Sequence, residues 1–437
     1  MKKIILAFGL MCGALGAQAQ TSFEEISENP LKAGGIYLAY PVTESANTPA
    51  PKGYEPFYIS HYSRHGSRYL IGDRDYRRVQ DLMQKGHDAG ALTPLGEDVL
   101  GRLQRIWPEA EKRGGDLTPL GARQHKGIAK RMYKAYPQVF ADDAEMTARS
   151  TVVMRCAHSM VAFCEGLKEE NPRLDIPKES SERYMGYLNY HGDESNHFTR
   201  QGGSWYEETR KFREAMTNPD RLTGSLFADS LFVVRNVNPD DLMWGLYWIA
   251  VDMQNMETRE DFMDLFTTQE LFDLWRAHNY SFYVTNSNPP SANGLLLSNS
   301  RPQLKNMLES ARQKIRDGKC GADLRFGHDG NLIPLAGLLN LENCYGSESD
   351  PYKLHEVYAD FKIAPMAGNI QMVFFRPKDA KKRAADGSDV LVKFMLNERE
   401  VHVDALHTDN FPFYRWPDVE AYWESILVQP LPEPLVD

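Results

Sequence analysis

Continuous apolar stretches stand out from amphipathic ones along this chain, and the first of them predicts a buried strand. Residues 57–62 (FYISHY) join aromatic and β-branched side chains with little polar alternation, as in strands that are covered on both faces. Residues 145–149 and 321–327 predict further strands. Residues 370–375 and 390–396, joined by a charged segment, predict a β-hairpin at the edge of the sheet.

Helix start signals and helical periodicity account for much of the remaining chain. Thr93 and Thr118 each stand before a proline, which pairs an N-cap with the residue favoured at the first helical position. Ser150 is expected to cap a helix with one broad apolar face. That face is formed by Val152, Val153, Cys156, Met160, Phe163 and Cys164. Residues 332–339 predict an apolar helix directly behind the third strand, and residues 416–427 predict a final helix.

The sequence pattern changes between about residues 168 and 319. Aromatic and charged side chains interleave there at helical spacing, as in residues 243–248. We therefore predict a mostly helical second domain, residues 168–319, inserted in an α/β domain formed by residues 20–167 and 320–437. Residues 21–52 are polar and contain prolines, and they are expected to lead into the first strand as an extended arm.

The first 19 residues have the pattern of a secretion signal. Lys2 and Lys3 form a positive region, residues 4–16 are apolar, and residues 17–19 (AQA) match a cleavage site. The apolar run is too short to span a bilayer. The pattern predicts an exported protein, periplasmic or secreted, from which this segment is removed.

The charge balance limits the partners of the chain. The formal net charge is −10, and it becomes −12 when Lys2 and Lys3 are removed with the signal. Such an acidic protein is a poor general binder of nucleic acid or of anionic membranes. We therefore expect a small-molecule ligand, and a phosphate ester would need a local cluster of arginines.

Four cysteines remain after the expected cleavage, and their spacing matches no zinc pattern. Cys156 and Cys164 lie eight residues apart on a predicted helix, roughly 12 Å along its axis, which is too far for a disulfide. Cys320 precedes a predicted strand and Cys344 follows the next helix. Those two could pair in an exported protein, and the sequence leaves this open.

The first centre of chemistry is Arg64-His65-Gly66-Ser67-Arg68, at the end of the first predicted strand. Arginine presents a planar fork of donors that matches phosphate oxygens, and histidine can act as a nucleophile. A histidine that attacks phosphorus between arginines is a compact site for phosphomonoester hydrolysis. The alternative is a basic strand end with an incidental histidine.

The second centre is His328-Asp329, between the strand that ends at Gly327 and the helix that follows. Turns at the carboxyl ends of strands form ligand sites in open α/β sheets. A bare His-Asp pair is also common in ordinary capping turns, so its weight comes from its combination with the first motif.

The two segments together resemble the histidine acid phosphatases, the family that includes phytases, prostatic-type acid phosphatases and multiple inositol polyphosphate phosphatases. Residues 64–70 are similar to its Arg-His-Gly-x-Arg-x-Pro motif, with Leu70 in place of the proline. Residues 327–332 resemble its Gly-His-Asp-x-Asn-Leu motif. Multiple inositol polyphosphate phosphatases commonly carry His-Ala-Glu there, whereas this chain has the His-Asp of phytases and general acid phosphatases.

This resemblance implies a phosphoglycerate-mutase-like, doubly wound sheet domain with a helical insert, and a mechanism through phosphohistidine. His65 would be the nucleophile and Asp329 the proton donor to the leaving alkoxide. The phosphoryl oxygens would be bound by Arg64, Arg68, Arg155 and His328. Residues 149–155 resemble the family's segment with the third phosphate-binding arginine, which assigns that role to Arg155 and a supporting one to Arg149. No metal or other cofactor is expected.

Two other functions stay open at this point. Phosphoglycerate mutases share the Arg-His-Gly motif and transfer the phosphoryl group to a sugar acid. An exported receptor for phosphate ligands would use the same cleft without turnover. For a phosphatase, the substrate class ranges over phytate, other inositol phosphates and general organic phosphates. Arg74, Arg77 and Arg78, on a charged helix after the motif, favour phytate if they face the phosphate entrance and not solvent.

Overall fold

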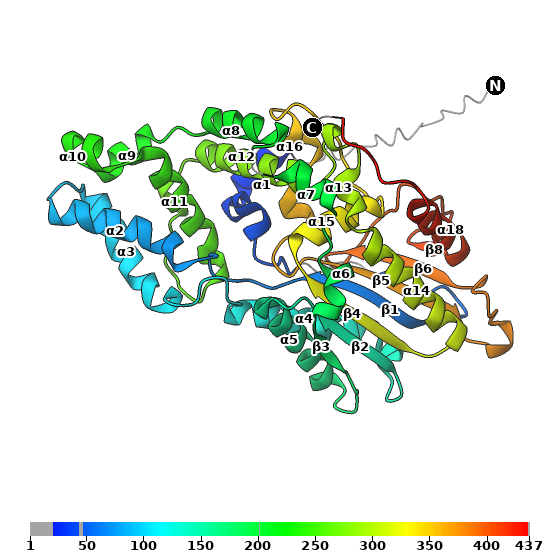
Figure 1. Ribbon diagram of the computed structural model, residues 1–437. Helices are drawn as coiled ribbons and strands as arrows, with labels where there is room; N and C mark the ends of the chain where they lie inside the picture. Colours follow the sequence, from blue (N-terminus) through cyan, green and yellow to red (C-terminus); the bar gives the residue numbers. More distant parts are fainter. Residues whose placement is uncertain (1–20, 43–46, 201, 436–437) are drawn as a thin grey trace, which may run out of the picture.

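The computed structural model of the protein describes residues 21–42, 47–200 and 202–435 (Figure 1). The expected secretion signal, residues 1–19, lies outside the described residues. The chain forms a mixed α/β fold in which a central sheet carries helices on both faces and a helical part extends to one side. None of the helices in the described residues combines the length and the hydrophobicity that a membrane span requires.

In the described part of the chain, the central sheet has eight strands in the order β3-β2-β4-β1-β5-β6-β7, with β8 also paired to β6. The strands β3, β2, β4 and β1 run parallel, and β5 lies antiparallel to β1. The strand bounds are β1 Tyr54–Arg64, β2 Glu145–Ser150, β3 Lys178–Ser180, β4 Gly321–Gly327, β5 Asn369–Pro377, β6 Leu391–Leu396, β7 Arg399–Glu400 and β8 Phe413–Arg415. The predicted strands and the β5–β6 hairpin are confirmed, but the hairpin does not form the edge of the sheet, because β6 also pairs with β7 and β8.

Both faces of the sheet are buried, which explains the apolar run in the first strand. Ile59 belongs to a cluster with Phe163 on the face covered by α4 and α5. Tyr58 and Tyr62 belong to the larger cluster on the opposite face, together with Trp416. Because successive side chains of a strand point to opposite faces, both sets must be apolar or aromatic to fill the two layers.

The capping signals predicted two helices, of which α4 belongs to the layer of helices near the sheet and α3 to the helical part described below. Thr93 and Thr118 are N-caps whose side chains accept hydrogen bonds from the backbone of Gly96 and Gly121. The bounds are α4 Pro119–Ala135, α5 Met154–Glu170, α6 Met185–Leu188, α14 Arg301–Asp317, α15 Asp329–Leu338, α16 Leu354–Val357, α17 Asp360–Ile363 and α18 Trp416–Leu427. The predicted helix 416–427 is confirmed at both ends.

The helical part draws on two separate stretches of the chain. The helices α2 and α3, which precede the expected insert, pack with α9 and α11. The bounds are α1 Ser22–Glu28, α2 Asp73–Asp88, α3 Pro94–Ala110, α7 Asp193–Thr199, α8 Ser204–Met216, α9 Asp220–Leu226, α10 Ser230–Asn236, α11 Pro239–Asp252, α12 Thr268–Asn286 and α13 Leu295–Ser298. The domain boundaries at 168 and 319 stay a prediction.

Two local expectations were wrong. Residues 21–37 do not form an extended arm, because Thr21 and Glu24 make a capping box that starts α1, and a 3-10 segment, Pro30–Tyr37, follows. Ser150 does not cap α5, because it is the last residue of β2. The helix begins at Met154 with Val153 in the cap position, so three residues turn the chain between strand and helix.

The four described cysteines are all free thiols, so the structure does not contain the Cys320–Cys344 disulfide that the sequence left open. Cys320 instead lies beside Arg376, whose Nη2 is 3.4 Å from the sulfur. Cys344 is buried, and its thiol lies 3.5 Å from the carbonyl oxygen of Glu342.

Candidate active site

The parallel pairing of β1 and β4 brings the two sequence motifs together. Arg64, the last residue of β1, lies in register with Gly327, the last residue of β4. The chain then continues the ladder by one step, because the backbone N–H of His65 donates to the Gly327 carbonyl at 3.0 Å. His65 and His328 therefore leave neighbouring strand ends at the same edge, and their rings are 5.8 Å apart. This is the sheet edge where ligands bind in open α/β folds.

Gly66 is required by close packing. A Cβ at this position would lie 2.5 Å from the Gly121 carbonyl oxygen at the start of α4, which is too close for a non-bonded contact between carbon and oxygen. Gly66 has no positive φ, so the glycine is required by this close approach and not by the backbone conformation. Its backbone N–H donates to Ser159 of α5 at 3.1 Å, which fixes the loop against both helices.

The His65 imidazole is buried, with 2% of the residue exposed. Its Nδ1 lies 2.9 Å from the carbonyl oxygen of Gly66. Because a carbonyl oxygen only accepts, this contact requires a proton on Nδ1 and leaves the lone pair on Nε2. Burial, with the positive charges of Arg64, Arg155 and Arg68, holds the pKa of His65 well below its ordinary value. The ring is thus neutral, with Nε2 free.

Arg64 is completely buried and is held from three sides. Its Nη1 donates to the carbonyl oxygens of Ile36 and Ala364. Its Nη2 lies 2.6 Å from a carboxylate oxygen of Asp329. The 3-10 segment Pro30–Tyr37, which the sequence did not link to the site, therefore forms part of the cradle of this arginine.

Arg68 and Arg155 come to the same centre from different elements. Arg68 lies over the ring of Tyr37 at 4.6 Å, and its Nη2 donates to the Tyr37 hydroxyl at 3.0 Å. Arg155 lies in the first turn of α5 and is partly exposed. The Nε atoms of both side chains are buried and have no hydrogen-bond partner among the described residues. A bound anion would supply acceptors for such donors.

The His328 side chain is positioned by Thr151, in the connection between β2 and α5, and by Cys156 of α5. Thr151 Oγ1 lies 3.2 Å from Nε2, and the thiol of Cys156 lies 3.7 Å from the same nitrogen. That thiol also lies 3.2 Å from the Gly327 carbonyl oxygen. Burial lowers the pKa of His328 to about 4. The neutral imidazole is therefore held in a fixed orientation at the edge of the site.

Asp329 opens α15 directly after the strand end. One carboxylate oxygen meets Arg64, and the other accepts from the backbone N–H of Gly330 at 2.8 Å. Burial opposes its charge, but the positive charge of Arg64, aided by His328 and Arg68, brings the pKa of Asp329 below its ordinary value. The carboxyl group is therefore ionised in this structure.

The structure brings all six residues expected from the motifs to one centre, but not the additional arginines. Arg149 forms an ion pair with Glu179 at 3.3 Å and lies over the Tyr184 ring. Arg77 forms an ion pair with Asp81, and Arg74 and Arg78 are exposed on the same helix, α2. Among the described residues, no contact links any of these four arginines to His65 or His328. The sequence did not indicate that these arginines lie away from the site.

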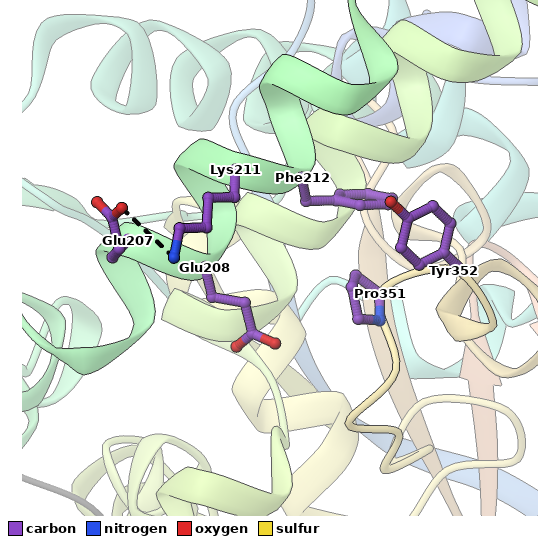
Figure 2. A pocket seen from close by; sticks show the side chains of 6 residues that line it. All are labelled: Glu207, Glu208, Lys211, Phe212, Pro351 and Tyr352. Carbon is purple, nitrogen blue, oxygen red and sulfur yellow. Dashed lines mark ion pairs between the residues drawn. The ribbon is translucent and has the colours of Figure 1, made fainter.

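A separate hollow lies on the helical part, between α8 and residues 351–352 (Figure 2). It is lined by Glu207, Glu208, Lys211, Phe212, Pro351 and Tyr352. The Lys211 ammonium lies 3.7 Å from Glu207, and the lining has neither an arginine nor a histidine. This hollow is therefore chemically unlike a phosphate site. Within the described part of the chain, no group of three or more His, Cys, Asp or Glu residues is arranged to hold a metal ion.

Several supporting residues were missed at the sequence level. Ile36 and Ala364 offer backbone carbonyls, which any residue type provides, so no sequence signal identifies them. Tyr37 lies 31 residues before Arg68 in the chain, in a segment without a recognisable motif. Thr151 lies inside the segment that pointed to Arg155 and Cys156 directly follows it, and only this neighbourhood hinted at a role.

The sequence profile of the histidine phosphatase superfamily (branch 2) matches residues 62–397. This covers well over half of the chain, and the protein belongs to that superfamily. The family expected from the two motifs is thereby confirmed, and so is the expected fold class.

The relatives described next are named either as multiple inositol polyphosphate phosphatases or as a phytase. Multiple inositol polyphosphate phosphatase 1 of Gallus gallus is 20% identical over 433 residues, 93% of this chain and 89% of that protein. The multiple inositol polyphosphate phosphatase of Bifidobacterium longum, in complex with inositol hexasulfate, superposes with a TM-score of 0.72 at 18% identity, covering 88% of this chain and 96% of that one. The phytase of D. castellii has a TM-score of 0.65 at 16% identity, covering 95% and 90%.

Proposed function

We propose that the protein is an exported phosphomonoesterase that hydrolyses inositol phosphates, phytate among them, and other organic phosphate esters through a phosphohistidine at His65. The observation that carries this proposal is the state of the His65 ring. It is neutral, its Nδ1 proton is engaged by the Gly66 carbonyl, and its Nε2 lone pair is free in a site with three arginines. A receptor without turnover has no need of a nucleophile in that state.

In the first step, Nε2 of His65 attacks phosphorus and the bond to the ester oxygen breaks. Arg64, Arg68 and Arg155 bind the phosphoryl oxygens, where charge accumulates in the transition state. The buried, unpartnered Nε atoms of Arg68 and Arg155 support this role. His328 adds a fourth group at the same centre, 5.8 Å from His65 between ring centres.

The leaving alkoxide needs a proton, and Asp329 is the group for this step. Its ion pair with Arg64 favours the ionised carboxylate before substrate arrives. A phosphate ester dianion draws on the charge of Arg64 and adds negative charge beside the carboxylate, and both effects raise the pKa of Asp329. Substrate binding thus favours the protonated acid. After proton transfer, the carboxylate can take a proton from the water that cleaves phosphohistidine.

The substrate class rests on the comparisons and on the charge of the site. The relatives from Gallus gallus and Bifidobacterium longum are named for inositol polyphosphates, and the D. castellii relative is named a phytase. Three arginines around one nucleophile suit the negatively charged phosphoryl group that each of these esters carries. Export is proposed from the pattern of residues 1–19 alone.

The test measures phosphate release from phytate and from an aryl phosphate, at pH 5 and 7, for the wild type and His65→Ala. We expect release from both esters by the wild type and loss of both activities in the variant. The ratio of the two rates gives the preferred ester. Binding of both esters without release would contradict the proposal and favour a receptor.

A further inference from the structure

Leu70 occupies the position where the family's motif usually has proline, and its backbone N–H is used. It donates to the hydroxyl of Tyr76 at 2.9 Å, and that hydroxyl donates to a carboxylate oxygen of Asp252 at 2.6 Å. Tyr76 is 1% exposed and Asp252 is completely buried. Proline has no N–H and cannot take part in such a chain of hydrogen bonds. The departure from the motif is thus coupled to two buried residues of α2 and α11.

The loop that contains Leu70 is also held along its opposite edge. The Leu70 carbonyl accepts from the backbone N–H of Gly115 at 2.8 Å, and the Tyr69 N–H donates to the Asp116 carbonyl at 3.1 Å. The Leu70 N–H is left for Tyr76. Removing the Tyr76 hydroxyl would therefore free one edge of the loop while the other stays paired.

This loop determines where the Arg68 side chain lies. The Nη1 atom of Arg68 donates to the carbonyl of Tyr69 at 2.9 Å, and its Nη2 atom donates to the hydroxyl of Tyr37. The carbonyl of Tyr37 accepts from Asn255 Nδ2 at 2.9 Å, and the same nitrogen lies 3.5 Å from Asp252. Asp252 is therefore linked to both groups that hold the Arg68 guanidinium. It reaches the Tyr69–Leu70 peptide through Tyr76, and it reaches Tyr37 through Asn255.

We propose that Tyr76 and Asp252 are positioning residues for Arg68. The hydrogen bond from Leu70 to Tyr76 fixes the loop here, as a proline ring would fix it through its covalent geometry. The inference rests on the proposed function, in which Arg68 binds the phosphoryl group. A small displacement of such a ligand lowers phosphate affinity and rate together.

The experiment compares Tyr76→Phe, Leu70→Pro and the double variant with the wild type. Binding of inorganic phosphate is measured by calorimetry, kcat and KM are measured with an aryl phosphate, and thermal unfolding is followed in parallel. Tyr414→Phe is the matched control. The hydroxyl of Tyr414 is also buried and accepts a backbone N–H, that of Val403, at 3.0 Å, but it lies on β8, away from the centre.

We expect Tyr76→Phe to weaken phosphate binding about tenfold, the size of one hydrogen bond at a buried polar group, and to raise KM. Leu70→Pro added to Tyr76→Phe should weaken binding by less than about twofold more, because the donor and its acceptor are then removed together. Tyr414→Phe should lower the unfolding temperature and leave phosphate affinity and KM unchanged.

Phosphate affinity of Tyr76→Phe equal to that of the wild type would overturn the inference, as would fully multiplicative effects of the two substitutions. Failure of the proposed function has a different signature, because the wild type would then bind phosphate but release none from the ester. The affinities still decide the inference in that case. A wild type that does not bind phosphate at all would contradict both.

Discussion

The ion pair between Arg64 and Asp329 couples the proposed phosphate ligand to the proposed proton donor. The two side chains are 2.6 Å apart, and the arginine is completely buried. In the proposed mechanism the same guanidinium stabilises the carboxylate and attracts the substrate, so Asp329 would become protonated when phosphate competes for Arg64. At the scale of single residues, the proposal therefore makes this exchange of partners the event that times proton transfer.

Asp329→Asn should separate the two roles of the site. Asparagine keeps the shape but has no carboxyl proton to give, so we expect phytate hydrolysis to fall by about 10²- to 10⁴-fold. The loss should be much smaller with p-nitrophenyl phosphate, whose phenolate leaves without protonation. Steady-state rates with both esters measure this difference. Equal losses with both would remove Asp329 from the proton-transfer step.

The pH dependence should follow from the same groups. The pKa of His65 lies well below 6.5, so the nucleophile stays neutral at mildly acidic pH. Asp329 must hold a proton in the substrate complex, and that proton becomes rarer as pH rises. We therefore expect kcat to be higher at pH 5 than at pH 8, measured with saturating substrate. A rate that still rises above pH 8 would be incompatible with this mechanism.

At the scale of elements, the 3-10 segment Pro30–Tyr37 is an unexpected part of the active-site scaffold. Asp360, at the start of α17, accepts the backbone N–H of Ile36 at 3.1 Å and the indole N–H of Trp275 at 3.0 Å. The Ile36 carbonyl in turn accepts from Arg64. One buried carboxylate therefore connects α12, α17 and the 3-10 segment that supports Arg64.

Gly35→Ala tests this support. Gly35 has φ +57°, and a Cβ there would lie 2.5 Å from a carboxylate oxygen of Asp360. We expect a loss of about 1–3 kcal/mol in unfolding free energy and a fall of about tenfold in kcat/KM as Arg64 shifts. Gly90→Ala is the control, since Gly90 has φ +64° and no neighbour within 4 Å of the place that a Cβ would take. Activity loss in both variants, or in neither, would refute the link to Arg64.

The elements differ in how far sequence could predict them. The strand ends with Arg64 and His328 were predictable because each motif is local and ends an apolar run. The support of Arg64 was not, because its contact with Ala364 spans 300 residues and uses a backbone carbonyl. The role of residues 30–37 was hidden for the same reason. Their composition resembles a loop, and burial against other helices gives them their structure.

At the scale of the whole molecule, the layer beneath the active site contains two buried histidines. His61 of β1 and His125 of α4 are completely buried near Phe163 and Phe326. Burial lowers the pKa of each to about 3. In the unfolded chain each titrates near its ordinary pKa of about 6.5. The unfolded state therefore binds more protons between these values, and stability must fall as pH falls through that window.

Each of these histidines should cost up to about 1.4 kcal/mol of stability per pH unit below 6.5. We expect His125→Leu to flatten the decline in unfolding free energy between pH 6 and pH 4 by about that slope. Chemical denaturation at several pH values measures it. An unaltered slope in His125→Leu would show that this histidine is not neutral in the folded state.

The central claim is that His65 carries the phosphoryl group during turnover, and trapping that intermediate tests it most directly. Wild type and His65→Ala are mixed with an aryl phosphate, quenched in alkali, digested and analysed by mass spectrometry. The account predicts a phosphoryl group on the peptide with His65, stable in alkali and lost in acid, and none in the variant. Steady turnover without any phosphoryl-enzyme, or a phosphoryl group on another residue, would contradict it.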